Sequence, residues 1–386
     1  MFSSRFHWND QPNRLTLALA AKRATGAHPL DLTESNPTRA GLFYPDAILD
    51  AFQDPSMLAY EPAPAGTQAA RAAVRAYYSA RGHAVPVERI LLTASTSEGY
   101  AYLFKLLTNP GDEVLVPRPS YPLFEFLADM ESVAVRQYPL VYHGGWEIDL
   151  DALEAAITVR TRAIILVNPN NPTGSYVKRG ELSALTRMCA ARGIALISDE
   201  VFADYPLGDD PSRVPTVAGV EECLAFSMSG LSKVAGLPQM KLGWIVVSGP
   251  DAARRQAWDH LEWVADTYLS VSTPVQCAAP RLLAAGEEVQ RQIRTRAAEN
   301  LAYARTTLEG SAANILAVEG GWYIILQVPR TRSEEEWTLH LLESANVLVQ
   351  PGFFYDFESE AYLVVSLLTS PPIFREGVAR ILTRLG

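Results

Sequence analysis

The sequence predicts an α/β protein in which a mainly parallel sheet is flanked by helices and accompanied by a smaller α+β unit. Three observations support this expectation. Helical and strand-like segments alternate from residue 68 onward, and the strand-like segments are continuous apolar runs, as in strands buried on both faces. The chain has 386 residues, which is more than one ordinary core holds and suits one large and one smaller lobe.

The alternating part begins with an amphipathic helix, rich in Ala and Arg, at residues 68–81. Further helices are expected at 98–107 and 180–192. Between them, short β-branched or apolar runs predict strands at 89–93, 113–116, 162–167, 194–198, 224–228 and 242–247. Ligands of such sheets bind beyond the carboxyl ends of the strands, so the chemistry is expected in the loops there.

The pattern changes after Pro250. Long helical segments are expected at 251–267 and 274–308, followed by strands at 316–328, 347–350 and 362–367 and helices at 333–345 and 372–385. This mixture predicts an α+β lobe that the N-terminal segment joins. We therefore expect a large domain at residues 41–285 and a small domain formed by 1–40 and 286–386.

Composition excludes several classes of partner. A net charge of −10 argues against nucleic acid or an anionic membrane surface. Three cysteines without close spacing indicate reduced thiols and a cytoplasmic protein. The polar segment 1–10 does not resemble a signal peptide, and no apolar run approaches the ~18 residues of a transmembrane helix. Six scattered histidines predict no metal site.

The strongest motif runs from Ser229 to Trp244, between two expected strands, and reads Ser-Gly-Leu-Ser-Lys-Val-Ala-Gly-Leu-Pro-Gln-Met-Lys-Leu-Gly-Trp. The chain has only five lysines, and Lys233 lies here among small residues. A lysine that forms a Schiff base must lose its proton, against a free pKa of ~10.4. Burial and a second cation such as Lys241 would lower this pKa. The alternative is a surface loop with two solvated lysines, and the spacing alone leaves both interpretations open.

Two further motifs decide between these interpretations. Asn168-Pro-Asn-Asn-Pro-Thr-Gly174 follows one expected strand, and Asp199-Glu200 ends the next. Together with the Ser-x-x-Ser-Lys run, their order and spacing resemble the class I/II aminotransferases, which are fold-type I enzymes dependent on pyridoxal phosphate (PLP). The resemblance extends from about residue 34 to about residue 380. It implies the fold-type I architecture, with PLP bound by the large domain.

The resemblance also implies roles for individual residues. Lys233 matches the lysine that holds PLP as a Schiff base and moves protons as general base and acid. Asp199 matches the acid that pairs with the protonated ring nitrogen, which makes the ring an electron sink. Asn171 matches the amide that binds the ring oxygen, and Tyr121 the aromatic residue that stacks on the ring. Lys233, Asp199 and Tyr121 are thus the expected catalytic residues.

Phosphate binding is expected from several segments. The turn before the helix at 98–107 contains Ser95, Thr96 and Ser97, whose N–H groups and hydroxyls suit a dianion at a helix N-terminus. A simple N-cap is the alternative, and both can hold at once. By resemblance, Ser232 and Lys241 also bind the cofactor. Tyr60 matches the tyrosine that reaches the phosphate of the neighbouring subunit, which implies a homodimer with shared active sites.

Three departures concern the cofactor. Lys241 stands where most relatives carry an Arg, so the charge is kept but the bidentate fork is lost. Gly230 stands where many relatives carry a phosphate-binding Ser. Phe202 replaces a Tyr that donates to the ring oxygen, and Tyr205 would compensate if it turned inward.

A fourth departure concerns the substrate. Relatives read Tyr-x-Arg-x-Ser near the C-terminus, and this Arg clamps the substrate carboxylate, whereas here the segment is Tyr-Leu-Val-Val-Ser with Val364 at the Arg position. Arg39, in the N-terminal segment that borders the substrate in this family, is the leading replacement. Arg118 and Arg375 are weaker candidates, and Asn171 is also expected at the substrate.

The sequence therefore predicts an aminotransferase that moves an amino group between an amino acid and a 2-oxo acid. A PLP-dependent lyase or decarboxylase is the alternative, because it would share every cofactor residue and would not need the clamp. A ligand-sensing regulator is a third class, but the segment before residue 34 is too short for a DNA-binding module. The donor is open, although a bulky or apolar side chain would suit a pocket bordered by Tyr60, Tyr121, Trp322, Phe353 and Tyr355.

Overall fold

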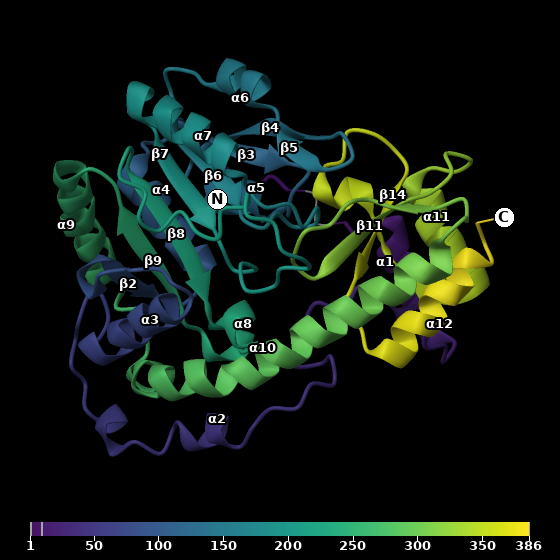
Figure 1. Ribbon diagram of the computed structural model, residues 1–386, viewed down its shortest axis with the longest axis horizontal. Coiled ribbons are helices and arrows are strands. Elements are labelled where there is room, and N and C mark those ends of the chain that lie inside the picture. The colour runs from purple at the N-terminus through teal and green to yellow at the C-terminus, as the bar shows by residue number, and fades with distance from the viewer. Residues whose placement is uncertain (1, 9–10, 386) are drawn as a thin grey trace.

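An eight-stranded sheet forms the larger part of the computed structural model, which describes residues 2–8 and 11–385 (Figure 1). Its strand order is β2-β9-β8-β7-β6-β3-β4-β5. The bounds are β2 (Ile90–Thr93), β3 (Glu113–Arg118), β4 (Ala134–Tyr142), β5 (Trp146–Ile148), β6 (Thr161–Val167), β7 (Ala195–Asp199), β8 (Ala225–Gly230) and β9 (Gly243–Ser248). Neighbours from β8 to β4 pair in parallel, whereas β9 is antiparallel to β2 and β8, and β5 is antiparallel to β4. The predicted mainly parallel sheet is confirmed.

Helices cover both faces of this sheet (Figure 1). On β6, Ile165 packs with the cluster that includes α4 (Thr96–Leu107), α5 (Leu123–Met130) and α9 (Asp251–Tyr268). Ile164 and Leu166 point to the other face, toward α6 (Leu150–Ala156) and α7 (Arg179–Arg192). On that same face, α3 (Gln68–Ala80) and α10 (Thr273–Leu308) cover β2 and β9. Burial on both faces explains the continuous apolar runs.

A second, antiparallel sheet has the order β10-β11-β14-β13. Its strands are β10 (Asn314–Ile315), β11 (Tyr323–Gln327), β13 (Gln350–Pro351) and β14 (Tyr362–Ser366). Its helices are α11 (Glu334–His340), continued by a π-helical turn at Leu341–Ala345, and α12 (Pro371–Leu382). The N-terminal segment joins this part through α1 (Arg14–Ala24) and through β1 (Leu30–Asp31), which pairs in parallel with β12 (Val347–Leu348).

The helix α10 runs along both parts of the molecule (Figure 1). The boundary expected between residues 285 and 286 falls inside this continuous helix, so the division into two domains stays a prediction. Met1, Asn9, Asp10 and Gly386, which belong to the predicted small domain, lie outside the described residues. The remaining elements are short. Two are α-helices, α2 (Ala47–Asp50) and α8 (Leu231–Val234). Four are 3₁₀-helices, η1 (Pro55–Leu58), η2 (Val87–Arg89), η3 (Pro238–Met240) and η5 (Gly352–Tyr355).

Some expected elements differ from the observed ones. The strand predicted at 316–328 is confined to β11 after a loop, because Gly320 and Gly321 interrupt it and Gly321 has a φ of +80°. The strand β4 was not predicted, since its outer position leaves an alternating pattern rather than an apolar run. Among the residues that the structure describes, no helix combines the length and hydrophobicity needed to cross a bilayer.

Candidate active site

Three motif-bearing loops meet at one edge of the large sheet. The loop of Asn171 follows β6, Asp199 is the last residue of β7, and α8 with Lys233 follows β8 directly. Because β6, β7 and β8 are parallel neighbours, their carboxyl ends lie at the same edge. The sheet thus brings Lys233, Asp199 and Asn171 together from positions far apart in the sequence.

Lys233 carries a buried amine beside an aromatic wall. Its Nζ lies 5.0 Å from the ring centroid of Trp322 and 5.7 Å from that of Phe202. Burial lowers the pKa of Lys233 to about 8, and the negative charge of Asp199 acts in the opposite direction. A substantial fraction of the amine is therefore neutral near pH 8, as a nucleophilic lysine requires.

Asp199 is the buried carboxylate that faces this amine. Burial raises the pKa of Asp199 to about 6, while the Val201 N–H, the Tyr100 hydroxyl and the charge of Lys233 oppose the shift. The two hydrogen bonds are long, at 3.3 Å each. Asp199 and Lys233 thus influence each other's pKa without forming a direct ion pair, which is the arrangement that a ring held between them would need.

The loop after β6 is tied to the loop that carries Tyr121. Asn170 donates to the carbonyl of Pro119 at 3.0 Å and accepts from the Ser120 hydroxyl at 3.1 Å. The neighbouring Asn171 is buried, and its Oδ1 has no hydrogen-bond partner among the described residues. Tyr121 is 48% exposed. A buried polar side chain without a partner usually indicates a ligand or water, so Asn171 suits a bound polar group.

The turn before α4 is the expected anion site. Ser95 is the N-cap residue of α4, because its Oγ accepts from the Glu98 N–H at 3.1 Å. Thr96 and Ser97 follow in the first turn and are half-buried. A Cβ at Gly243 would lie 3.0 Å from the backbone of Ser95, so glycine allows β9 to approach this turn closely. The helix N-terminus, with its free N–H groups, remains available to an anion.

The other cofactor candidates lie around the same turn. Lys241 is exposed, has a φ of +53° and precedes β9, whose Gly243 pairs with Thr93. Ser232 is half-buried in α8. A Cβ at Gly230 would lie 2.9 Å from the Leu242 carbonyl oxygen, so no serine fits there without movement. Glycine at position 230 therefore lets the chain pass close to the Leu242 carbonyl.

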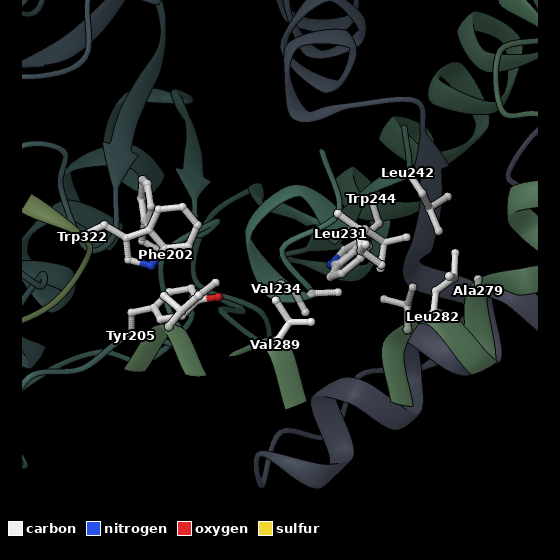
Figure 2. Packing of buried hydrophobic residues seen from close by; sticks show 14 of the residues in the cluster. Phe202, Tyr205, Leu231, Val234, Leu242, Trp244, Ala279, Leu282, Val289 and Trp322 are labelled. Atoms are coloured by element: carbon white, nitrogen blue, oxygen red, sulfur yellow. The ribbon is translucent and has the colours of Figure 1, made fainter. Parts of the chain in front are cut away.

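Tyr205 does turn inward, but its hydroxyl is already engaged. It donates to the backbone carbonyl of Lys233. Its ring lies edge-on to Trp322, with centroids 5.1 Å apart, and Trp322 also contacts Phe202 at 5.2 Å. Figure 2 shows these three aromatic side chains gathered in one group. Tyr205 thus supports the lysine rather than offering a free donor in place of the tyrosine missing at Phe202.

The wall that carries Val364 is uncharged. Val364 pairs with Ile325 and Gln350, is 1% exposed, and packs in the same buried cluster as Tyr355 and Trp322. A carboxylate placed against this wall would be desolvated without a cation. The structure thus offers no clamp at Val364.

Of the three arginines considered as replacements, two are committed elsewhere. Arg118 donates to the carbonyl of Asp356 at 2.8 Å and pairs with Glu358 at 3.1 Å, and Arg375 lies over the ring of Tyr303. The side chain of Arg39 is exposed and makes no hydrogen bond or ion pair with any described residue. Its segment runs past the end of β14, where the Ser366 hydroxyl donates to the Glu34 carbonyl at 2.6 Å. Arg39 is thus the uncommitted cation of the three.

Tyr60 does not join this group within the chain. Its side chain is 71% exposed and borders a hollow that is also lined by Leu269 and Gln276, at the junction of α9 and α10. Tyr60 thus has a largely exposed side chain and lines a hollow whose lining residues do not include Lys233.

Sequence reasoning missed one polar partner of the site. Tyr100, on α4, donates to Asp199 Oδ2 across the sheet edge. Its spacing of four residues from Thr96 places both on one helix face, a signal that was available in the sequence. Gln290 and Tyr44, which bind the segment around Lys233, carried no such signal.

Known proteins resemble this chain along most of its length. Residues 27–375 match the family model of aminotransferase class I and II. Glutamate-pyruvate aminotransferase AlaA of Escherichia coli (strain K12) is 31% identical over 271 residues, which are 69% of this chain and 66% of that protein. S-alkyl-thiohydroximate lyase SUR1 of Arabidopsis thaliana is 31% identical over 242 residues, or 62% of this chain and 52% of the relative. These alignments span less than two thirds of the relatives' lengths.

A solved structure extends the likeness to the whole fold. The alanine aminotransferase from Pyrococcus furiosus superimposes with a TM-score of 0.89 at 23% identity, covering 100% of this chain and 99% of the other. At this identity the match establishes the architecture, which is that of fold-type I, and leaves the substrate open.

Proposed function

Because the chain belongs to the class I and II aminotransferases, we propose that it is a PLP-dependent enzyme that moves an amino group between an amino acid and a 2-oxo acid. One observation carries this proposal: Lys233 and Asp199, an amine and a carboxylate with shifted pKa values, lie together at the sheet edge without a direct ion pair. Perturbed titratable pairs of this kind mark functional sites.

The residues present fit the cofactor. Lys233 would hold the aldehyde, Asp199 the ring nitrogen and Asn171 the ring oxygen, with Tyr121 against the ring. The phosphate would lie at the turn formed by Ser95, Thr96 and Ser97, beside Ser232 and Lys241. PLP supplies an aldehyde that condenses with amines and a ring that withdraws electrons from the substrate. Its site draws on residues 93–241, within the large domain that we propose at 41–285.

The chain's own residues supply the proton chemistry. The neutral amine of Lys233 removes the proton from the α-carbon of the amino acid and returns a proton in the following step. Asp199 is negatively charged above its pKa of about 6, so at neutral pH its charge would favour a proton on the nitrogen of a bound ring. The aromatic wall of Phe202 and Trp322 keeps water away from the amine.

A PLP-dependent lyase is the second candidate, favoured by the match to a named lyase and by Val364 at the clamp position. The test is a single-turnover screen of the holoenzyme against the common amino acids, with cofactor absorbance and released products measured together. An aminotransferase converts one amino acid to its 2-oxo acid in equal amount to the enzyme, and a 2-oxo acid then restores the spectrum. A lyase instead turns over repeatedly, releases a side-chain fragment or CO2, and needs no 2-oxo acid.

We propose that Arg39 binds the substrate carboxylate in place of the clamp lost at Val364. Arg39→Ala is then expected to raise KM sharply and to lower kcat for the best amino acid in the screen. The combined loss should be ~2–5 kcal/mol, because the carboxylate is buried without its partner. Steady-state kinetics at several donor concentrations measure both constants.

Two controls isolate this role. The loss should disappear for the decarboxylated amine that corresponds to the best donor, since that amine has no carboxylate. Arg23→Ala, a change at another exposed arginine of the N-terminal segment, should leave both constants as in the wild type. Unaltered kinetics of Arg39→Ala toward its best amino acid would reject Arg39 as the clamp.

We also propose that the enzyme is a homodimer in which Tyr60 reaches the phosphate site of the partner subunit, supported by the exposure of Tyr60. Mixing inactive Lys233→Ala chains with chains inactivated at Tyr60 should restore part of the activity. One of the two hybrid sites then holds Lys233 and Tyr60 intact. Activity recovered after mixing and subunit exchange is the measurement.

The control for this experiment is subunit exchange itself, followed with two differently tagged chains. Hybrids that form without any recovery of activity would remove the support for shared sites. A cytoplasmic location is a further proposal, supported by three cysteines that are all free. The net charge of −10 supports small-molecule partners rather than nucleic acid.

A further inference from the structure

Lys233 stands on a very short helix. The helix α8 has only four residues, Leu231–Val234, and no side chain caps its N-terminus at Gly230. A helix of one turn has little stability of its own, because nucleation fixes several residues for few hydrogen bonds. The position of the Lys233 backbone must therefore be set by contacts from outside this segment.

Three side chains supply such contacts by donating to carbonyls of this segment. The Tyr205 hydroxyl donates to the carbonyl of Lys233 itself. The Gln290 side chain, on α10, donates to the carbonyl of Val234 at 2.9 Å. The Tyr44 hydroxyl, from the N-terminal segment, donates to the carbonyl of Gly236 at 2.8 Å.

Tyr205 is the donor that acts on Lys233 directly, and it is itself held firmly. It is 1% exposed and packs against Trp322 (Figure 2). The Trp322 ring in turn lies 5.0 Å from the Lys233 Nζ. The preceding Asp204 accepts from the Tyr77 hydroxyl at 2.9 Å and pairs with Arg81 at 2.5 Å. The loop that carries Tyr205 is thus anchored on one side and contacts the lysine on the other.

We infer that Tyr205 is a positioning residue that aligns the Lys233 amine for attack on the cofactor aldehyde. In this step the neutral amine nitrogen bonds to the aldehyde carbon, the carbon–oxygen bond breaks, and the oxygen leaves as water with the two amine hydrogens. The side chain of lysine has four rotatable bonds, so its reach is measured from a backbone that must be fixed. A small displacement of a reacting group slows a reaction strongly, about a hundredfold for 1 Å. This inference rests on the proposed function, in which Lys233 is the attachment site.

Tyr205→Phe removes the hydroxyl and keeps the ring. The apoenzyme of this variant should capture PLP covalently about tenfold more slowly than the wild type. Its affinity for pyridoxine 5′-phosphate, which has an alcohol in place of the aldehyde, should be unchanged, because that probe does not react with Lys233. Stopped-flow absorbance measures the capture, and quenching of tryptophan fluorescence measures the affinity. A merely structural role would weaken both.

Tyr78→Phe is the matched control. Tyr78 is another buried tyrosine of the same cluster, but its hydroxyl accepts from the Trp244 indole at 3.2 Å and does not contact the Lys233 segment. Both variants lose one buried hydrogen bond, so their melting temperatures should fall similarly. Of these two variants, Tyr205→Phe alone should slow capture. Gln290→Met, which removes the donor to Val234, should slow capture in the same direction.

The outcomes separate this inference from the proposed function. Borohydride reduction followed by peptide mapping reports which lysine holds PLP in each protein. A label at another lysine in the wild type would overturn the proposed function. A label at Lys233 with equal capture rates in Tyr205→Phe and Tyr78→Phe would overturn the positioning role of Tyr205 alone. If Tyr205→Phe does not fold, Gln290→Met provides the test. An unchanged capture rate in that variant would overturn the inference that hydrogen bonds to the backbone carbonyls around Lys233 position its amine.

Discussion

Lys233→Ala is expected to abolish covalent attachment of PLP while leaving weaker, non-covalent binding at the turn before α4. The change removes the nucleophile and also the group that moves the substrate proton, and loss of a general base alone costs about 10²–10⁴-fold in rate. Turnover should therefore fall below detection. Borohydride reduction of the wild type, followed by peptide mapping, should find a pyridoxyl group on Lys233 and none in the variant.

Lys178→Ala is the control, because the Lys178 amine is paired with Glu319. It should keep full labelling at Lys233. The pH dependence gives an independent check, since only the neutral amine attacks an aldehyde. With a pKa lowered to about 8, capture of PLP by the apoenzyme should increase as the pH rises through about 8 and then level off. Capture that continues to rise toward pH 10 would contradict a buried, activated lysine.

Asp199→Asn is expected to lower turnover by about 10²–10³-fold, on the order of 3–4 kcal/mol, with much less effect on cofactor retention. Asparagine has the same shape: its Oδ1 can still accept from the Val201 N–H, and its amide N–H can donate to the Tyr100 hydroxyl. It lacks the charge that would stabilise a protonated ring nitrogen. Steady-state kinetics and the dissociation rate of PLP measure the two effects separately. Turnover close to that of the wild type would exclude Asp199 as the ring's partner.

Glu200→Gln serves as the neighbouring control. Glu200 points to the opposite face, where it accepts from the Thr216 hydroxyl and the Val217 N–H. The Glu200→Gln variant should retain most of the wild-type turnover. Wild-type turnover should also fall when the pH drops to about 6 or below, because Asp199 then takes up a proton. A protonated ring nitrogen beside Asp199 would lower the pKa of Asp199 from about 6, so the decline in turnover begins at or below pH 6. Asp199→Asn should lack it.

The edge of the large sheet where Lys233, Asp199 and Asn171 meet could be predicted because it depends on local patterns. Each of these residues follows a continuous apolar run, and the carboxyl ends of parallel strands necessarily share one edge. The three motifs therefore predict which loops lie together, and this prediction needs no knowledge of long-range packing. Family resemblance added the roles of the individual side chains.

The contacts around Lys233 could not be predicted in the same way. Gln290 and Trp322 lie about sixty and about ninety residues further along the chain. Their positions depend on how α10 and the second sheet pack against the large sheet. The same holds for Tyr205, whose orientation the sequence left open and whose hydroxyl donates to a backbone carbonyl. The strand β4, next to the edge strand β5, escaped prediction because it is not buried on both faces.

The helix α10 connects the segment of Lys233 with the second, antiparallel sheet, because side chains at two positions along the helix bind the two parts. Gln290 holds the carbonyl of Val234, and ten residues later Asn300 donates to the carbonyls of Leu367 and Thr369, just beyond β14. At 1.5 Å and about 100° per residue, these two side chains are separated by about 15 Å and a fixed angle. A single inserted residue between them would swing one amide away from its carbonyls. The composition of the exposed face of α10 is therefore free to vary, whereas the number of residues between Gln290 and Asn300 is not.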